Sequence, residues 1–115
     1  MPTLTLIAGP NGSGKSTYTR SVDFEGRERL LDPDAIARSL NPLNPVAAAF
    51  AAGRETLQRT EDYLAQGVSF AVETTLSSRS HADLMRRAKA RGYEVHLIFV
   101  SLDSPEYHAY PESGG

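Results

Sequence analysis

The chain has 115 residues, of which 40% are hydrophobic and 23% charged, and its formal net charge is −2 with no cysteine. A chain of this length can bury one modest core, so we expect a single domain. The slight acidic balance offers nucleic acid no general attraction, and the lack of cysteine excludes disulfides and thiolate metal sites. A predicted strand begins by Thr3 and no apolar run approaches membrane-spanning length, so we expect a cytoplasmic protein without a membrane segment.

A phosphate-binding loop is predicted near the N-terminus. The apolar residues 3–8 indicate a short strand, and residues 15–22 favour a helix. Between them the sequence GPNGSGKS matches the pattern G-x-x-x-x-G-K-[ST] at every fixed position. The expected nucleotide-binding residues are Gly9, Pro10, Asn11, Gly12, Ser13, Gly14, Lys15, Ser16 and Thr17.

Each fixed position in this loop has a physical reason. Glycines let the backbone turn its N–H groups toward an anion, and the start of the following helix attracts negative charge. Lys15 is expected to reach the β- and γ-phosphates, and the Ser16 hydroxyl is expected to bind Mg²⁺. The alternative is a glycine-rich turn that binds nothing, but the strand before it and the helix after it favour phosphate binding.

The remaining elements follow from hydrophobic periodicity, capping residues, glycine and proline. In chain order they are a strand at 29–32, a helix at 34–40, a helix from Asn44 and Pro45 to Gln66, a strand at 68–72, a helix from the capping box Ser80–Asp83 to Gly92, and a strand at 94–100. On the long helix, an apolar stripe is expected to face the core through Val46, Phe50, Leu57 and Leu64.

Strands that alternate with helices predict an α/β fold with a parallel sheet of about four strands and helices on both faces. Ligands of such a sheet bind at the carboxyl ends of its strands. Three acidic segments follow strands there, at residues 32–34, 73–76 and 101–106. We therefore expect them to surround the phosphate site.

These segments together resemble the zeta-toxin-like P-loop kinases, which have the three-layer fold of P-loop NTPases. The resemblance rests on IAGPNGSGKST, DPDAIARSL, AAGRETL and the stretch from LAQGVSFAVETTL to VSLDSPE, in that order, and covers residues 3 to about 106. It implies an ATP- and Mg²⁺-dependent kinase that phosphorylates a hydroxyl of a small molecule or a nucleotide sugar such as UDP-N-acetylglucosamine. It also implies an antitoxin as a partner protein.

The resemblance assigns roles to residues outside the loop. Asp34, rather than Asp32, matches the general base that orients the attacking hydroxyl, although Asp34 could instead cap the following helix. Glu73 and Thr75 match substrate-contacting positions, with support of Mg²⁺ through water an equal alternative for Glu73. Arg79 is a candidate for contact with substrate or phosphate, and a solvated loop arginine is its alternative.

Other polar residues are interpreted as structural. These are His81 and His96, the acidic and polar residues Asp103, Ser104 and Glu106, expected to begin another capped helix, and the basic cluster Arg86, Arg87, Lys89 and Arg91, expected to be a solvated face. Nucleic acid is therefore not the expected partner.

The expected kinase core spans residues 1–106, and residues 107–115 form a short tail where the family's pattern continues with an arginine-bearing lid and another strand. No Lys or Arg follows Arg91. A sheet of this type places the first strand centrally, between the third and the fourth, with the second outside the third. Residues 94–100 are then an edge strand, through which we expect the chain to self-associate or to require a partner.

Two other functions are consistent with the same residues. A polynucleotide 5′-hydroxyl kinase shares these parts but requires a basic groove for the strand. A non-catalytic nucleotide-binding module would retain the phosphate loop alone.

Overall fold

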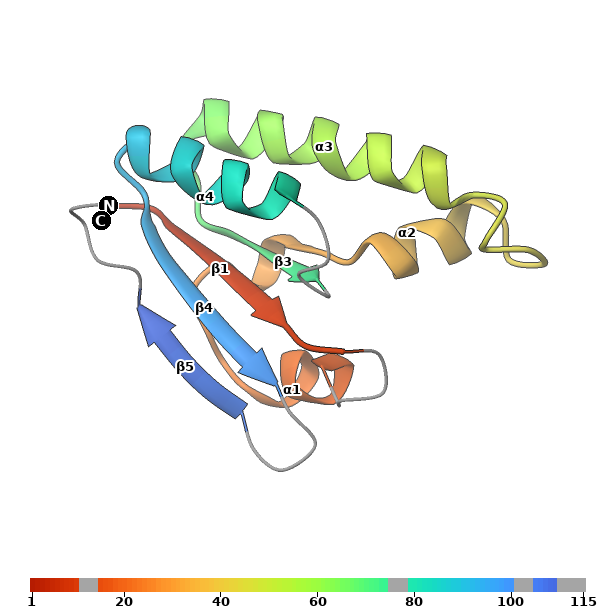
Figure 1. Ribbon diagram of the computed structural model, residues 1–115, viewed down its shortest axis with the longest axis horizontal. Coiled ribbons are helices and arrows are strands. Elements are labelled where there is room, and N and C mark those ends of the chain that lie inside the picture. The colour runs from red at the N-terminus through yellow and green to blue at the C-terminus, as the bar shows by residue number, and fades with distance from the viewer. Residues whose placement is uncertain (11–14, 75–78, 101–104, 110–115) are drawn as a thin grey trace.

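The computed structural model describes residues 1–10, 15–74, 79–100 and 105–109, which form a five-stranded sheet flanked by helices (Figure 1). The strands are β1 (Thr3–Ala8), β2 (Leu30–Leu31), β3 (Phe70–Thr74), β4 (Glu94–Val100) and β5 (Pro105–Ala109). The helices are α1 (Lys15–Ser21), α2 (Pro33–Leu40), α3 (Ala49–Gln66) and α4 (Arg79–Ala90), with a short 3₁₀ helix at Arg27–Arg29.

The strand order is β2-β3-β1-β4-β5, and the first four strands have the predicted parallel arrangement. β1 is buried along its whole length because it lies between β3 and β4 and both of its faces are covered. Ala8, its last residue, is in register with Thr74 of β3 and Phe99 of β4. The carboxyl ends of these strands therefore meet at one edge, as the sequence predicted.

Helices cover both faces of the sheet, which confirms the predicted three-layer α/β fold. On one face, Leu4 and Leu6 of β1 share a cluster with Leu64 of α3 and Leu84 of α4. On the other, Ile7 packs in a smaller cluster with Ile98 and Val100, against which Tyr18 of α1 is packed. The alternation of side chains along β1 thus supplies both interfaces.

The expectation that residues 94–100 form an edge strand is wrong. β5 pairs antiparallel with β4, from Val100 opposite Pro105 to His96 opposite Ala109. The predicted helix start at Glu106 is also wrong, because this residue lies within β5. β5 crosses the predicted boundary between kinase core and tail, and it occupies the β4 edge through which we expected self-association.

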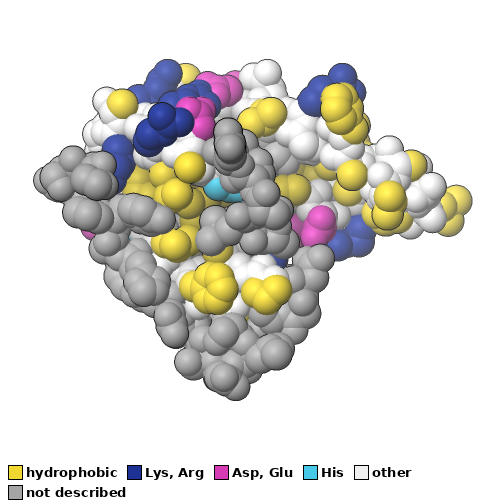
Figure 2. Space-filling model, viewed as in Figure 1, with side chains coloured by type: hydrophobic (Ala, Val, Ile, Leu, Met, Phe, Trp, Pro, Cys, Tyr) yellow, Lys and Arg dark blue, Asp and Glu magenta, His cyan; other side chains and the backbone are white. Residues whose placement is uncertain are grey.

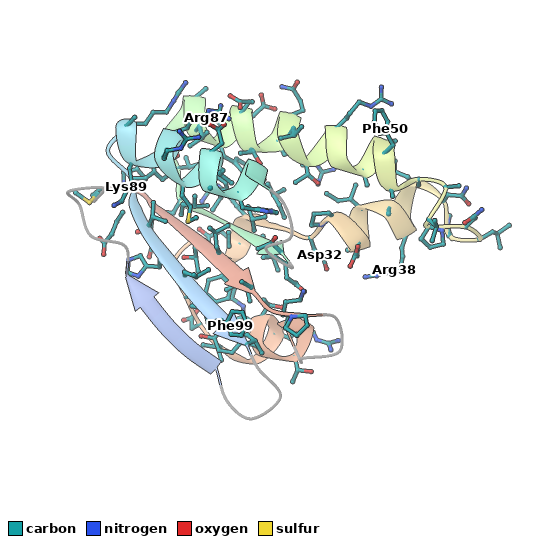
Figure 3. The ribbon with its side chains drawn as sticks, in the orientation of Figure 1. Asp32, Arg38, Phe50, Arg87, Lys89 and Phe99 are labelled. Carbon is teal, nitrogen blue, oxygen red and sulfur yellow. The ribbon has the colours of Figure 1, made fainter. Side chains whose placement is uncertain are left out.

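The α2–α3 hairpin projects beyond the sheet (Figure 1), and this corrects the expected core-facing stripe. Leu64 is buried, but Val46, Phe50 and Leu57 are 84%, 78% and 56% exposed. Hydrophobic side chains gather on the projecting end of the molecule in Figure 2, and Phe50 points away from α2 in Figure 3. The periodicity of α3 continues past the part of the helix that the sheet covers.

The start of α3 also differs from the prediction. Residues 45–48 form turns in which the N–H groups of Ala47, Ala48 and Ala49 donate to carbonyls three residues earlier, and the α-helix begins at Ala49. Asn44 caps this turn, because its side chain accepts from the Ala47 N–H at 3.3 Å. Gly67 ends α3 in a left-handed conformation, as predicted.

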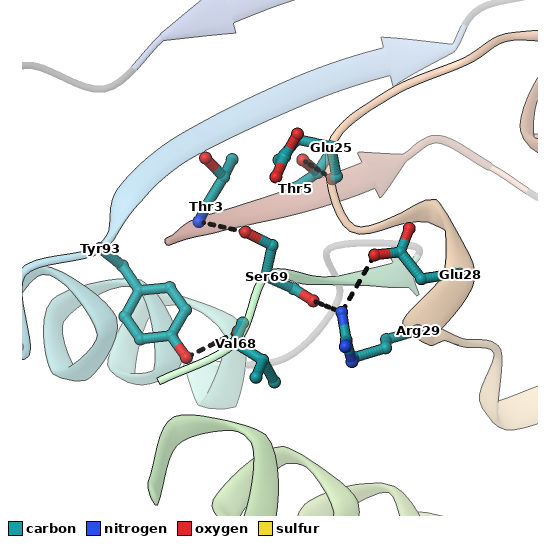
Figure 4. A network of polar contacts seen from close by, with 8 residues as sticks. All are labelled: Thr3, Thr5, Glu25, Glu28, Arg29, Val68, Ser69 and Tyr93. Carbon is teal, nitrogen blue, oxygen red and sulfur yellow. Dashed lines mark hydrogen bonds and ion pairs between the residues drawn. The ribbon is translucent and has the colours of Figure 1, made fainter. Parts of the chain in front are cut away.

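Polar contacts fix the amino ends of the strands, opposite the carboxyl-end edge (Figure 4). The Thr3 N–H donates to Ser69 Oγ at 2.9 Å, and the Tyr93 hydroxyl donates to Val68 O at 2.7 Å. Gly26 lies against this region with φ 89°, and a Cβ there would lie 2.8 Å from the Phe70 backbone. Only glycine allows this approach of the chain to β3.

Within the described residues, no helix is long and apolar enough to cross a membrane.

Candidate functional site

A small cavity of about 150 Å³ opens at the carboxyl ends of β2 and β3. Its walls come from the start of α1, the β2–α2 junction, the end of β3 and the start of α4, and the lining residues are Lys15, Asp32, Pro33, Asp34, Glu73, Thr74 and His81. Lys15, Asp34 and Glu73 had been predicted to act together from positions up to 58 residues apart in the sequence. The parallel topology brings them to one place.

Lys15 is the first residue of α1 and is half-buried in this cavity. Its Nζ donates to Gly9 O at 2.6 Å and to Thr74 O at 3.3 Å, so the ammonium is held between the ends of β1 and β3. Gly9 has φ 154° and its N–H also donates to Thr74 O, at 3.2 Å. The fixed position of the ammonium places a positive charge where the phosphate loop meets the sheet.

The two aspartates of the DPD segment have different roles in the structure. Asp32 is the N-cap of α2, because one carboxylate oxygen accepts from the N–H groups of Asp34 at 3.1 Å and Ala35 at 3.2 Å. Pro33 occupies the first helical position, where its missing N–H costs no hydrogen bond. The alternative that Asp34 caps α2 is therefore wrong: Asp32 caps it (Figure 3), and Asp34 lines the cavity with an exposed side chain.

Glu73 is a carboxylate within β3 and not after it, because the strand extends to Thr74. It is only 8% exposed, and it is in register with Ile7 of β1. A charged side chain is rarely buried to this extent unless polar groups or cations compensate for lost hydration. Its position on the cavity wall provides a negative charge within reach of a ligand there.

His81 also lines the cavity, although sequence analysis treated it as structural. It lies in the first turn of α4, and its Nδ1 is 3.2 Å from Thr74 Oγ1. The available signal was positional, since the helix after β3 begins at the sheet edge where ligands bind. His96 instead lies on β4, with Nε2 2.7 Å from Glu94 Oε1.

Several predicted site residues lie outside the described residues. These are Asn11, Gly12, Ser13, Gly14 and Thr75, together with the side chains of Ser16 and Arg79, as well as Asp103 and Ser104. Pro10 and Thr17 are described, and both are exposed on either side of the loop.

The described residues fit a bound nucleotide phosphate. Lys15 supplies a fixed ammonium at the start of a helix, and Gly9 supplies the backbone geometry that the first loop position requires. Three acidic side chains, Asp32, Asp34 and Glu73, line the same cavity and could orient water around Mg²⁺. Among the described residues, no group of three or more His, Cys, Asp or Glu side chains is arranged to hold a metal ion alone. Mg²⁺ usually keeps several waters and is shared with substrate phosphates, so it does not require such a group.

A larger hollow of about 500 Å³ lies along the sheet, from the amino ends of β1 and β4 to Thr5 and Ile98, and contains no predicted site residue. Thr3, Thr5, Glu94 and His96 are among its lining residues. We assign the candidate site to the smaller cavity because ligands of parallel sheets bind at the carboxyl ends.

The basic cluster of α4 is largely engaged in internal contacts. Arg87 pairs with Glu61 of α3, and Arg86 pairs with Asp83 at 3.0 Å. Arg91 donates to Leu64 O at 3.3 Å. Arg86 and Arg91 are exposed, as expected of a solvated face, whereas Arg87 and Lys89 are partly buried and Arg87 joins α4 to α3.

Comparison with known proteins agrees with the geometry. The family model described as "Zeta toxin" matches residues 1–106. The chain is also 37% identical over 115 residues to an uncharacterized protein of Haemophilus influenzae, covering 96% of this chain and 81% of that protein. The chain therefore belongs to the zeta toxin family, which indicates a nucleotide-binding function of the P-loop kinase type.

Proposed function

We propose that this chain is an ATP-dependent kinase core that transfers the γ-phosphoryl group to a hydroxyl of a small molecule or nucleotide sugar of the UDP-N-acetylglucosamine kind. The observation that carries the proposal is the shared cavity of Lys15, Asp34 and Glu73 at the carboxyl ends of the strands. In this arrangement, a cation that can bind the phosphate lies beside carboxylates that can orient the acceptor hydroxyl, and phosphoryl transfer requires both.

Lys15 and the loop residues Gly9 to Thr17 hold the nucleotide phosphates in this proposal, and Ser16 holds Mg²⁺. MgATP supplies the phosphoryl group when bound. Asp34 orients the acceptor hydroxyl and receives its proton, and its position matters more than its basicity because the transition state is loose. Its exposed side chain, in contrast to the capping carboxylate of Asp32, supports this assignment.

Glu73, Thr75 and Arg79 are proposed to contact the acceptor. Glu73 is the one of these whose side chain the structure describes, and its buried position on the cavity wall supports direct contact or support of Mg²⁺ through water. We further propose that the protein acts in the cytoplasm and that an antitoxin is its protein partner, on the basis of family membership.

The two alternatives have less support. A polynucleotide kinase needs cations along the strand, but Arg86, Arg87 and Arg91 already make internal contacts and three carboxylates line the cavity. A non-catalytic nucleotide-binding module would need Lys15 to bind phosphate but would not need Asp34, because no acceptor hydroxyl is oriented.

The test is phosphate transfer from γ-labelled MgATP to UDP-N-acetylglucosamine, free sugars, nucleosides and a 5′-hydroxyl oligonucleotide. We expect labelled product with a sugar or nucleotide sugar. Lys15→Ala should abolish MgATP binding, while Lys89→Ala, which changes the chain's other lysine, should leave it intact. Binding without transfer to any acceptor would favour the non-catalytic module, and transfer to the oligonucleotide alone would favour the polynucleotide kinase.

A further inference from the structure

His81 lines the cavity, although sequence analysis interpreted it as structural and gave it no part in the site. Of the side chains that line the cavity, those of Lys15 and His81 contain nitrogen, and the remaining polar ones are carboxylates and a threonine. His81 is half-buried and comes from α4, whereas Lys15 comes from α1. The two helices approach the cavity from opposite faces of the sheet, since α4 packs with Leu6 and α1 packs with Ile7.

Thr74 connects these two residues. Its carbonyl oxygen accepts from Lys15 Nζ at 3.3 Å and from the Gly9 N–H at 3.2 Å. Its hydroxyl oxygen lies 3.2 Å from His81 Nδ1. Thr74 is 6% exposed and ends β3, so both contacts are formed by a buried residue anchored in the sheet.

The geometry points to His81 as a positioning residue for Lys15, acting through Thr74. The hydrogen bond to the Thr74 hydroxyl holds the last residue of β3 against the start of α4, and the carbonyl of the same residue accepts from the lysine ammonium. Through Thr74, the start of α4 therefore influences the position of the Lys15 ammonium. This inference rests on the proposed function for its consequence in nucleotide binding, but the contact between His81 and Thr74 exists without it.

If the role of His81 is purely structural, its replacement should have a different effect. If His81 merely stabilised the start of α4, its replacement would lower the unfolding free energy and leave the Lys15 position unchanged. A positioning role requires a hydrogen-bonding atom at the site of Nδ1. Asparagine places a polar atom near that site, whereas glutamine places one nearer to Nε2 and leucine places none.

The first experiment tests, without any nucleotide, whether His81 is coupled to Lys15 through Thr74. Ring ¹H and ¹⁵N signals of His81 and His96 would be compared in the wild type, Thr74→Val and Lys15→Met. We expect both variants to shift the His81 signals, Thr74→Val more strongly, and to leave those of His96 unchanged. Unchanged His81 signals in Thr74→Val or in Lys15→Met would overturn the inference, whatever the activity of the protein.

The second experiment measures the MgATP affinity of His81 variants by titration. His81→Leu and His81→Gln should weaken binding about three- to tenfold, the usual effect of one net hydrogen bond. His81→Asn should restore most of the affinity, and His96→Asn should match the wild type. Equal affinity in all four variants, or rescue by glutamine and not by asparagine, would overturn the inference. A wild type that binds no MgATP would refute the proposed function instead, and the ring signals would still decide the connection from His81 to Lys15.

Discussion

At the scale of single residues, neighbouring side chains of the same type perform different tasks because of a small difference in backbone position. Asp32 precedes the first turn of α2 and its carboxylate satisfies two backbone N–H groups. Asp34 lies within that turn and lines the cavity. The chemistry of the carboxylate is the same in both, so its local hydrogen bonds determine its role.

Substitution of the two aspartates should separate stability from activity. Asp32→Ala should lower the unfolding free energy by about 1 kcal/mol, because it removes the N-cap. Asp34→Asn should change it by less than about 0.5 kcal/mol, since the side chain is exposed, but should abolish phosphate transfer while MgATP binding persists. Denaturant unfolding and a transfer assay on both variants provide the test. A loss of MgATP affinity in Asp34→Asn would identify it instead as a metal-supporting or structural residue.

Ionisation of Tyr93 should make the unfolding free energy depend on pH in the alkaline range. Burial raises the pKa of its hydroxyl above the ordinary value of 10.0, against a smaller opposing effect of Arg91. The hydroxyl has one proton to donate, and its oxygen lies 2.7 Å from Val68 O and 3.0 Å from Tyr63 O, so Tyr93→Phe should cost about 1–3 kcal/mol.

The sign of the pH effect follows from the raised pKa. The unfolded chain loses this proton first, so the contribution of Tyr93 is complete below pH 10 and is lost as the pH rises through the folded-state pKa. Unfolding free energies measured from pH 8 to 11 should therefore fall more steeply for the wild type than for Tyr93→Phe. Some dependence should remain, because burial also raises the pKa of Tyr18. Parallel curves for the two proteins would contradict this origin of the effect.

At the scale of elements, α3 shows that an amphipathic stripe is buried only where another element covers it. Its C-terminal half packs on the sheet through Leu64, and its N-terminal half packs on α2 through Ala52. The face that carries Phe50 and Leu57 remains exposed, and Arg54 lies over the Phe50 ring at 5.2 Å.

The same substitution at two positions of α3 measures this difference. Leu64→Ala should cost about 2–5 kcal/mol, because Leu64 is 2% exposed and its removal leaves a cavity in the core. Leu57→Ala should cost less than about 1 kcal/mol, because Leu57 is 56% exposed. Chemical denaturation of both variants would show whether the stripe is exposed. Similar large losses for both would mean that Leu57 is covered in solution.

At the scale of the whole molecule, the position of β5 decides which strand edge is available to other chains. Because β5 pairs with β4 from His96 to Val100, the apolar β4 strand lies inside the sheet. The outer edge belongs to a strand that begins with proline, a residue that protects edges from further pairing.

A pair of proline substitutions tests this pairing. Successive N–H groups of a strand point to opposite sides, so one of Tyr107 and His108 donates toward β4 and the other points away from it. We expect one of Tyr107→Pro and His108→Pro to release β5 and to cause concentration-dependent association in sedimentation velocity at micromolar concentration. The other should sediment as the wild type does. Identical behaviour of both variants and the wild type would show that β5 does not protect β4.

Much of the fold was predictable because its signals are local. The phosphate-loop pattern, the apolar strands and the glycine that ends α3 are read within a few residues, and alternation of strands and helices implies the parallel order. The candidate site followed from one general rule about strand ends. Asp34 and Glu73 were predicted beside Lys15 on this basis, and the cavity contains all three.

The family, the α/β architecture and the principal charged residues of the cavity could be predicted before the structure was known, because residue type and short-range spacing encode them. The folded arrangement was needed to show that Asp32 caps α2, that His81 contacts Thr74, that Leu57 is exposed and that β5 pairs with β4. These outcomes depend on which atoms and surfaces meet in space, even where the residues are near in sequence, as in the Asp32 cap and the contact of His81 with Thr74. Hydrophobic periodicity indicates that one face of a helix is apolar, but it does not indicate which element packs against that face.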